Sequence, residues 1–264
     1  MNFDYRFRVS DFRISLLLLW LATVSTGHAF AGTTTQQSDP SSIAWATQAM
    51  NALDGGVLPS SVTLQANVVR VNNGQQESGA VALQSTSISN SRIDFTFGSA
   101  TWSEVRSFGA NGPSGQWIDT SGTTHQMAQH NCMTDAVWFF PALSSLSAFA
   151  DPSLVFSDLG NEQHRGATVE HLRVYRAASV LPPQAAHTLA LMSVTDYYLD
   201  SQTALPVAIV FFAHPDNDTN VSIPIEITFS AYQRVTQTMV PFQITKYYNG
   251  TQLFQLSVTS AQVQ

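Results

Sequence analysis

The stretch that most constrains the fold of this chain is residues 221–230, with the sequence VSIPIEITFS. Its apolar residues occupy every second position: Val221, Ile223, Ile225, Ile227 and Phe229. A period of two places these side chains on one face of a β-strand, whereas the turn of a helix would scatter them around its axis. We therefore predict a strand here, with one face in the core and a polar face outside.

The segments that follow repeat this alternation. Apolar and polar residues alternate over residues 240–245 and again over 254–259, with Asn249-Gly250 between them. Asn and Gly accept the positive φ angles of a tight hairpin turn, so we predict an antiparallel hairpin. Residues 205–212 (LPVAIVFF) are apolar on both faces, which predicts a central strand covered on both sides.

The N-terminal half is predicted to form one helix followed by a meander of strands. The helix has an apolar stripe of Ile43, Ala46, Ala49, Met50 and Leu53. Gly55-Gly56 is typical of the residues that end a helix. From residue 61 the period changes to two, and a shift in the apolar register predicts a β-bulge near Val68. Short connections such as Asn73-Gly74 indicate that strands adjacent in sequence are neighbours in the sheet.

The middle of the chain lacks alternation. Residues 134–149 (TDAVWFFPALSSLSAF) are predicted to form one or two helical pieces, the second beginning at Pro141. Residues 182–192 are predicted to be irregular or helical. We assign a helical insert to about residues 131–150. The predicted fold class is mainly β with a few helices (α+β), in a single domain over residues 40–264.

The first 31 residues have the layout of a secretory signal peptide. Three arginines precede the apolar run 14–24, and residues 29–31 (Ala-Phe-Ala) supply the small-residue cleavage site. The run is shorter than the ~20 apolar residues of a membrane-spanning helix. We expect cleavage after residue 31, a flexible leader over 32–39, and a mature protein in the periplasm or outside the cell.

Composition and charge exclude some classes of partner. Charged residues make up only 11% of the chain, and its formal net charge is −7. Removing residues 1–31 takes away three arginines and two aspartates, which leaves −8. An acidic surface repels phosphate backbones, so we expect no nucleic-acid partner. No segment of the mature chain is long and apolar enough to predict a transmembrane helix.

The nearest arrangement to a catalytic site consists of His125, His130, Cys132 and Asp135. A Cys-His pair oriented by a carboxylate can activate a thiolate nucleophile, and the same residue types can bind a metal. The segment has no strand-to-helix elbow and no metal-binding motif, so the sequence favours a buried, inert Cys132. We expect neither an enzyme nor a cofactor nor a metal site.

Aromatic residues are concentrated in the N-terminal half and the central insert. The set is Trp45, Phe97, Trp102, Phe108, Trp117, Trp138, Phe139 and Phe140. Large aromatic side chains dominate ordinary cores, so core packing is the plain interpretation. The functional interpretation is that a curved sheet leaves a hydrophobic cavity lined by these residues, and such cavities accept apolar ligands.

Two segments resemble a known superfamily. Residues 197–212 (YYLDSQTALPVAIVFF) and 239–258 (MVPFQITKYYNGTQLFQLSV) are similar to the closing strands of the periplasmic lipoprotein carriers of the LolA and LolB type. The resemblance covers mainly the last third of the chain. It implies a curved antiparallel half-barrel, with helices over the concave face and an apolar cavity that takes acyl chains.

The function predicted from these observations is non-enzymatic binding of an apolar or lipidic ligand by an exported protein. The eight aromatic residues above are the predicted walls of its site. A second prediction stays open, in which the core is filled and the module acts through surface contact with another envelope protein or a glycan.

Overall fold

The computed structural model describes residues 37–72, 74–178 and 180–264. The predicted signal peptide and most of the predicted leader lie outside this part of the chain. The described residues contain two α-helices, α1 (Pro40–Asp54) and α2 (Pro183–Ser193), and three short 3-10 helices, η1 (Gln129–Cys132), η2 (Pro141–Leu143) and η3 (Ser145–Ala148).

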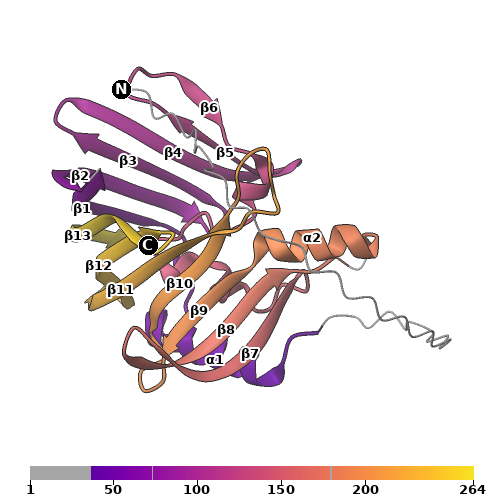
Figure 1. Cartoon of the computed structure of the whole chain (residues 1–264). Helices are drawn as coiled ribbons and strands as arrows, with labels where there is room; N and C mark the ends of the chain where they lie inside the picture. The colour runs from indigo at the N-terminus through magenta and orange to yellow at the C-terminus, as the bar shows by residue number, and fades with distance from the viewer. Residues whose placement is uncertain (1–36, 73, 179) are drawn as a thin grey trace, which may run out of the picture. The chain divides into compact units, whose positions relative to one another are not determined.

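Thirteen strands form one antiparallel sheet (Figure 1). The strands of the N-terminal half are β1 (Val62–Asn72), β2 (Gln75–Ser87), β3 (Asn90–Phe97), β4 (Ala100–Gly109), β5 (Gly112–Ile118) and β6 (Thr124–Gln126). The strands of the C-terminal half are β7 (Leu154–His164), β8 (Ala167–Arg176), β9 (Thr195–Asp200), β10 (Pro206–Ala213), β11 (Ile223–Val235), β12 (Thr238–Tyr248) and β13 (Thr251–Val263).

The order of the strands divides the sheet into two limbs. It runs β6-β5-β4-β3-β2-β1-β13-β12-β11-β10-β9-β8-β7, so each limb is a meander of sequence neighbours, as predicted. The limbs join in the middle of the sheet, where β1 pairs with β13. The sheet is open, because β6 and β7 are its two edges.

The sheet curves strongly toward one face. In a flat sheet β3 and β13 would lie about 14 Å apart, since β2 and β1 separate them. The rings of Phe95 on β3 and Phe254 on β13 nevertheless stack with their centroids 4.8 Å apart. This contact requires the sheet to curl around these side chains, so we call the face that carries them the concave face.

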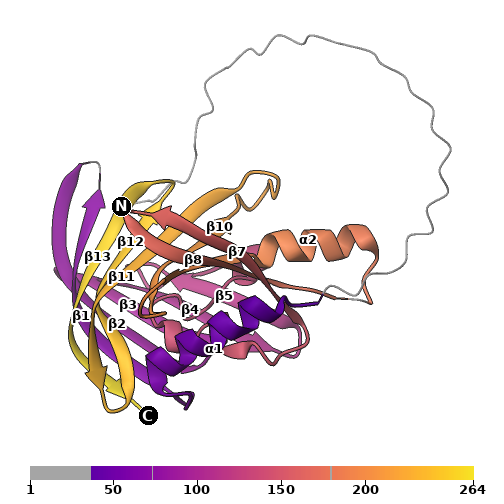
Figure 2. The same cartoon turned by 90° about the horizontal axis from the view of Figure 1, so that it is seen from below.

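The main core lies on the concave face and includes one side of α1. Ala46, Ala49 and Leu53 are fully buried there, and α1 contacts β12 and β7 (Figure 2). Helix α1 ends as predicted, since Gly55 adopts a left-handed conformation with φ 69°. Helix α2 contacts β8 and otherwise extends away from the sheet (Figures 1 and 2).

The start of α1 also covers part of the edge strand β7. The backbone N–H of Phe156 donates to Ser38 Oγ at 3.0 Å, and the carbonyl of Phe156 accepts from the N–H of Asp39 at 2.9 Å. The Ser42 hydroxyl donates to the same carbonyl at 2.9 Å. These bonds satisfy backbone groups that the edge strand would otherwise expose.

The alternating stretches form the predicted strands, with local differences. Ile225, Ile227 and Phe229 of β11 are buried, but Val221 is wrongly assigned to that face. Val221 precedes the strand in a loop and is 45% exposed, because β11 begins only at Ile223. The predicted Asn249-Gly250 hairpin is confirmed, with φ values of 48° and 76°.

Two further expectations differ in detail. The irregularity predicted near Val68 lies between Gln65 and Ala66, where the pairing of β1 with β13 shifts register. The central insert forms 3-10 turns rather than α-helices. Pro141 begins a helical piece as predicted, but within residues 134–149 this piece is the first and not the second. Short-range hydrogen bonds hold these turns in place of the regular bonds of a continuous helix. The Ser144 hydroxyl, for example, donates to the carbonyl of Pro141.

Candidate functional site: the concave face and its two crevices

The concave face carries an aromatic cluster on β3, β4 and β13. Strand pairing places Phe95 opposite Trp102, and their rings stack with centroids 4.3 Å apart. Phe254 completes the cluster, with its ring 6.1 Å from that of Trp102. Further along the limb, Trp117 of β5 stacks on His125 of β6 at 3.9 Å. The concave face is therefore aromatic from its centre to the β6 edge.

The central insert fills the middle of this face. Trp138, Phe139 and Phe140 are at most 2% exposed and belong to the main core. The ammonium group of Lys246, from β12, lies 4.3 Å from the centre of the Trp138 ring. Burial lowers the pKa of this ammonium, and the nearby Glu104 carboxylate partly opposes the effect.

The structure distributes the eight predicted cavity residues over three environments. Phe97, Trp138, Phe139 and Phe140 are buried in the core, while Trp45 and Trp102 are half-buried against it. Trp117 is half-buried and covered by His125, and Phe108 is 51% exposed. Of the eight, only Phe108 borders either of the two crevices of the concave face described next.

The first crevice is narrow, about 50 Å³, and lies between the limbs. Its walls include Arg106 and Phe108 of β4, Leu154 of β7, and Val174 and Arg176 of β8. The Arg106 side chain is nearly buried, with 6% of the residue exposed. The Arg106 Nη2 group donates to the carbonyls of Asn131 and Thr134, both at 3.1 Å. We call this space the arginine crevice.

The second crevice is wider, about 360 Å³, and follows the β4–β5 hairpin. It is lined by residues 107–115 together with Gln126, Met127 and Gln129. Phe108 and Pro113 border both crevices, so the two spaces adjoin. The volume of this hairpin groove falls within the range of about 300–1,000 Å³ that is usual for small-ligand sites.

A buried hydroxyl and carboxyl network supports one wall of the arginine crevice. Asp135 accepts hydrogen bonds from the Tyr197 hydroxyl and from the Ser145 backbone N–H, the latter at 3.0 Å. Burial raises the pKa of the Asp135 carboxyl. Both Asp135 oxygens are thus engaged within the wall, because the Ser145 hydroxyl also donates to its Oδ2 at 3.1 Å.

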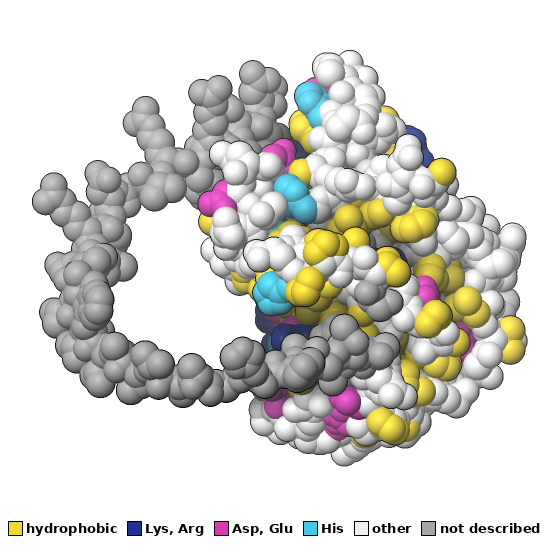
Figure 3. Space-filling model, turned by 90° about the vertical axis from the view of Figure 1, so that its right-hand side faces the viewer, with side chains coloured by type: hydrophobic (Ala, Val, Ile, Leu, Met, Phe, Trp, Pro, Cys, Tyr) yellow, Lys and Arg dark blue, Asp and Glu magenta, His cyan; other side chains and the backbone are white. Residues whose placement is uncertain are grey.

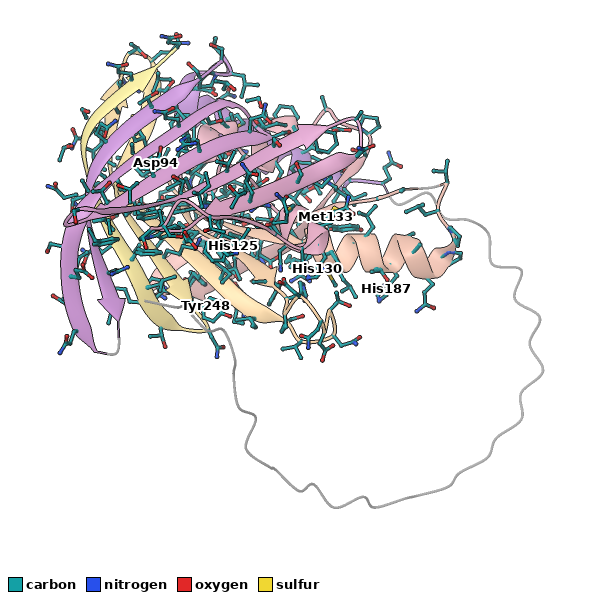
Figure 4. All side chains as sticks on the ribbon, turned by 90° about the horizontal axis from the view of Figure 1, so that it is seen from above. Asp94, His125, His130, Met133, His187 and Tyr248 are labelled. Atoms are coloured by element: carbon teal, nitrogen blue, oxygen red, sulfur yellow. The ribbon has the colours of Figure 1, made fainter. Side chains whose placement is uncertain are left out.

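The candidate catalytic residues do not assemble into one unit. His125 pairs with Asp119, with 3.0 Å between Nε2 and Oδ2. Cys132 donates to the carbonyl of Ala128 at 3.6 Å, and burial raises the pKa of its thiol. His130 packs edge-on against His214, with ring centroids 6.1 Å apart. In Figure 4, His130 and Met133 lie beside the base of α2, whereas His125 lies on β6.

No protein-family model matches the chain, and neither does any curated protein. A solved domain from Vibrio parahaemolyticus, assigned to outer membrane lipoprotein sorting, matches with a TM-score of 0.53 and 11% identity, over 85% of this chain and 92% of that one. A LolA superfamily protein from Nitrosomonas europaea matches with a TM-score of 0.52 and 9% identity, over 84% and 93% of the two chains. The fold is LolA-like.

A third match extends the same conclusion. A DUF1329 family protein from Desulfovibrio piger has a TM-score of 0.53 and 10% identity, over 86% of this chain and 94% of that one. The LolA-like fold confirms the resemblance seen in residues 197–212 and 239–258. Those residues form β9, β10 and the β12–β13 hairpin, which lie in the C-terminal limb.

The sequence alone did not single out the cationic side of this LolA-like concave face. Arg106 lies on the same strand face as Trp102 and Phe108, which the alternation of β4 already indicates. Arg176 gives no such signal, because its approach to Phe108 depends on the two limbs of the sheet curling toward each other. Its guanidinium carbon lies 5.9 Å from the centre of the Phe108 ring.

The described residues contain no cluster of three or more His, Cys, Asp and Glu side chains that would hold a metal. Neither of the two helices within residues 37–264 that the structure describes is long and apolar enough to cross a bilayer. Apolar residues are exposed before and on α2, namely Val180, Leu181 and Leu191, and Figure 3 shows hydrophobic side chains across the centre of the face from which α2 projects.

Proposed function

We propose that this protein is an exported, non-enzymatic carrier that binds an apolar or lipidic ligand on the concave face of its sheet. The observation that carries the proposal is the combination of a LolA-like fold with an aromatic concave face bordered by a groove of about 360 Å³. The Vibrio parahaemolyticus domain of the same fold is assigned to lipoprotein sorting, which supports a lipidic cargo.

The ligand would reach the eight aromatic residues in two stages. Phe108 is exposed at the hairpin groove and offers the first contact. Trp138, Phe139 and Phe140 fill the concave face, so deeper entry requires the central insert to move away from the sheet. In this proposal α1 and the insert act as covers of the concave face, and the leader and signal peptide serve export to the periplasm or the cell exterior.

A second function is favoured by a specific observation. The insert is packed into the core, and apolar side chains are instead exposed around α2, as expected of a module that contacts another envelope protein. Uptake of a ligand distinguishes the two proposals, because the filled module has no place for an acyl chain.

The test uses the full chain exported from a bacterial host and a fluorescent acyl probe with an uncharged head, the methyl ester of dansylaminoundecanoic acid. We expect saturable binding that Phe108→Ser weakens by about tenfold, since burying a Phe ring contributes ~1.5–3 kcal/mol. Leu159→Ser is the matched control, because Leu159 is equally exposed, at 50%, on β7. An absence of binding by the unmodified chain would contradict the carrier proposal and favour the interaction module.

A further inference from the structure

The arginine crevice is unusual because it brings two arginines together in an acidic protein with only 11 Lys and Arg residues. Four arginines of the described residues form close ion pairs with carboxylates: Arg70 with Glu77, Arg92 with Asp94, Arg165 with Glu226, and Arg173 with Asp196. Arg106 and Arg176 form no such pair within the part of the chain that the structure describes. Both line the same crevice.

The two guanidinium groups approach from opposite limbs. Arg106 projects from the concave face of β4, two residues before Phe108, and Arg176 reaches over Phe108 from the end of β8. Arg106 uses only its Nη2 for hydrogen bonds to described residues, although a guanidinium carries five N–H donors. Arg176 forms no side-chain hydrogen bond to any described residue. Most of the donors of this pair are therefore available.

No carboxylate of the described residues forms a close ion pair with Arg106 or Arg176. Asp135 lies in the wall and interacts electrostatically with Arg176, but its oxygens accept hydrogen bonds from Tyr197 and Ser145 rather than from an arginine. Asp151 Oδ1 accepts from the Ser153 backbone N–H at 2.8 Å. Lys246 adds a further cation close to Arg106 on the same face, with the Glu104 carboxylate nearby. Its ammonium rests on the Trp138 ring and forms no close ion pair with a described residue.

The size of the space selects the kind of anion. A volume of about 50 Å³ is several times the ~10–15 Å³ that one water molecule needs on the same measure, so the arginine crevice has room for a compact group such as a carboxylate or a phosphate. The adjoining hairpin groove is several times larger and shares the exposed Phe108 and Pro113 with the crevice. A ligand with a small anionic head and an apolar tail matches the two spaces together.

We propose that the arginine crevice binds the anionic headgroup, a carboxylate or a phosphate, of an amphiphile whose chain lies along Phe108 in the hairpin groove. This inference rests on the proposed function and deepens it, because it names the chemical class of the cargo. Arg176 and Arg106 clamp the headgroup from the two limbs, since the planar guanidinium fork can pair two N–H groups with two oxygens of a carboxylate or a phosphate.

The experiment compares dansylaminoundecanoic acid with its methyl ester on the full exported chain. We expect the acid to bind about tenfold more tightly than the ester, and Arg176→Gln to abolish this preference while leaving ester binding within about twofold. Arg176 is chosen because its side chain holds no backbone group, unlike that of Arg106. The matched control is Arg92→Gln, on the opposite face of the sheet, which should preserve the preference for the acid.

The outcomes separate the two proposals. Equal binding of acid and ester, or a preference that survives Arg176→Gln, overturns the headgroup site and leaves the carrier function standing. Failure of both probes to bind the unmodified chain overturns both. Arg176-dependent binding of inorganic phosphate, measured by calorimetry in the absence of any acyl probe binding, would assign the crevice to a free anion instead of an amphiphile. Thermal unfolding of each variant, followed by circular dichroism, checks that the fold is retained.

Discussion

At the scale of single residues, one carboxyl group with a raised pKa lies away from the crevices. Glu170 of β8 is only 3% exposed and accepts a hydrogen bond from the Asn161 side chain across the β7–β8 pair. Burial, together with the neighbouring Asp158, raises the pKa of the Glu170 carboxyl from 4.5 to about 7. The folded protein thus holds a proton here at a pH where the unfolded chain has already released it.

This proton gives the stability of the fold a definite pH dependence. Between the unfolded pKa of 4.5 and the folded pKa of about 7, the folded state binds more protons, so the contribution of Glu170 to stability falls as pH rises. Glu170→Gln removes the titration. We expect this variant to match the unmodified chain near pH 5 and to have the higher melting temperature at pH 8. If the melting temperatures of Glu170→Gln and the unmodified chain differ by the same amount at pH 5 and at pH 8, the raised pKa of Glu170 is contradicted.

At the scale of the strand pair, β2 and β3 lie close together because Gly79 of β2 has no side chain. A Cβ atom added at Gly79 would lie 2.3 Å from the carbonyl oxygen of Thr96 and 2.7 Å from the Phe97 ring. Arg70 covers a face of that ring, with its guanidinium carbon 4.2 Å from the ring centre. The strand backbone must therefore move to admit any larger residue.

Gly79→Ala is accordingly expected to destabilise the fold by about 1–3 kcal/mol, the usual range for overpacking. Gly109→Ala serves as the control, because a Cβ there meets no atom within 4 Å. That substitution is expected to change the free energy of unfolding by less than about 0.5 kcal/mol. Denaturant titration of both variants measures the difference, and equal midpoints would show that β2 adapts without cost.

The elements also show how far sequence reasoning reaches. Alternation identified the strands because one buried face imposes a period of two, and the Asn249-Gly250 turn was predictable because both residues tolerate positive φ. The insert was harder, since Trp138, Phe139 and Phe140 are buried on all sides and carry no periodicity. The arginine crevice was out of reach, because Arg106 and Arg176 meet only through the curvature of the whole sheet.

At the scale of the whole molecule, the two limbs depend on one seam. Strand β13 pairs with β1, and the Ser60 hydroxyl donates to the carbonyl of Gln264, 204 residues away, at 3.1 Å. Leu256 of β13 is fully buried in the core shared by both limbs. The limbs are therefore expected to unfold together rather than one at a time.

Leu256→Ala tests this cooperativity. We expect a loss of about 2–5 kcal/mol, the usual cost of such a truncation in a core, with amide hydrogen exchange accelerating in both limbs. Gln255→Ala, on the exposed side of the same strand, should change neither the free energy of unfolding nor the rates of amide hydrogen exchange. Faster exchange confined to β12 and β13 would mean that the limbs are energetically independent.

The open sheet has a consequence for how copies of this protein behave at high concentration. An unpaired edge strand is a template on which another chain can add, which is the first step toward fibrils. One edge, β6, has only three residues and offers too short a template. At the other, Ser38, Asp39 and Ser42 already occupy the backbone groups of Phe156. Residues 38–42 thus protect the edge of β7 from pairing with another copy of the chain. Removing this segment would expose that edge and favour aggregation.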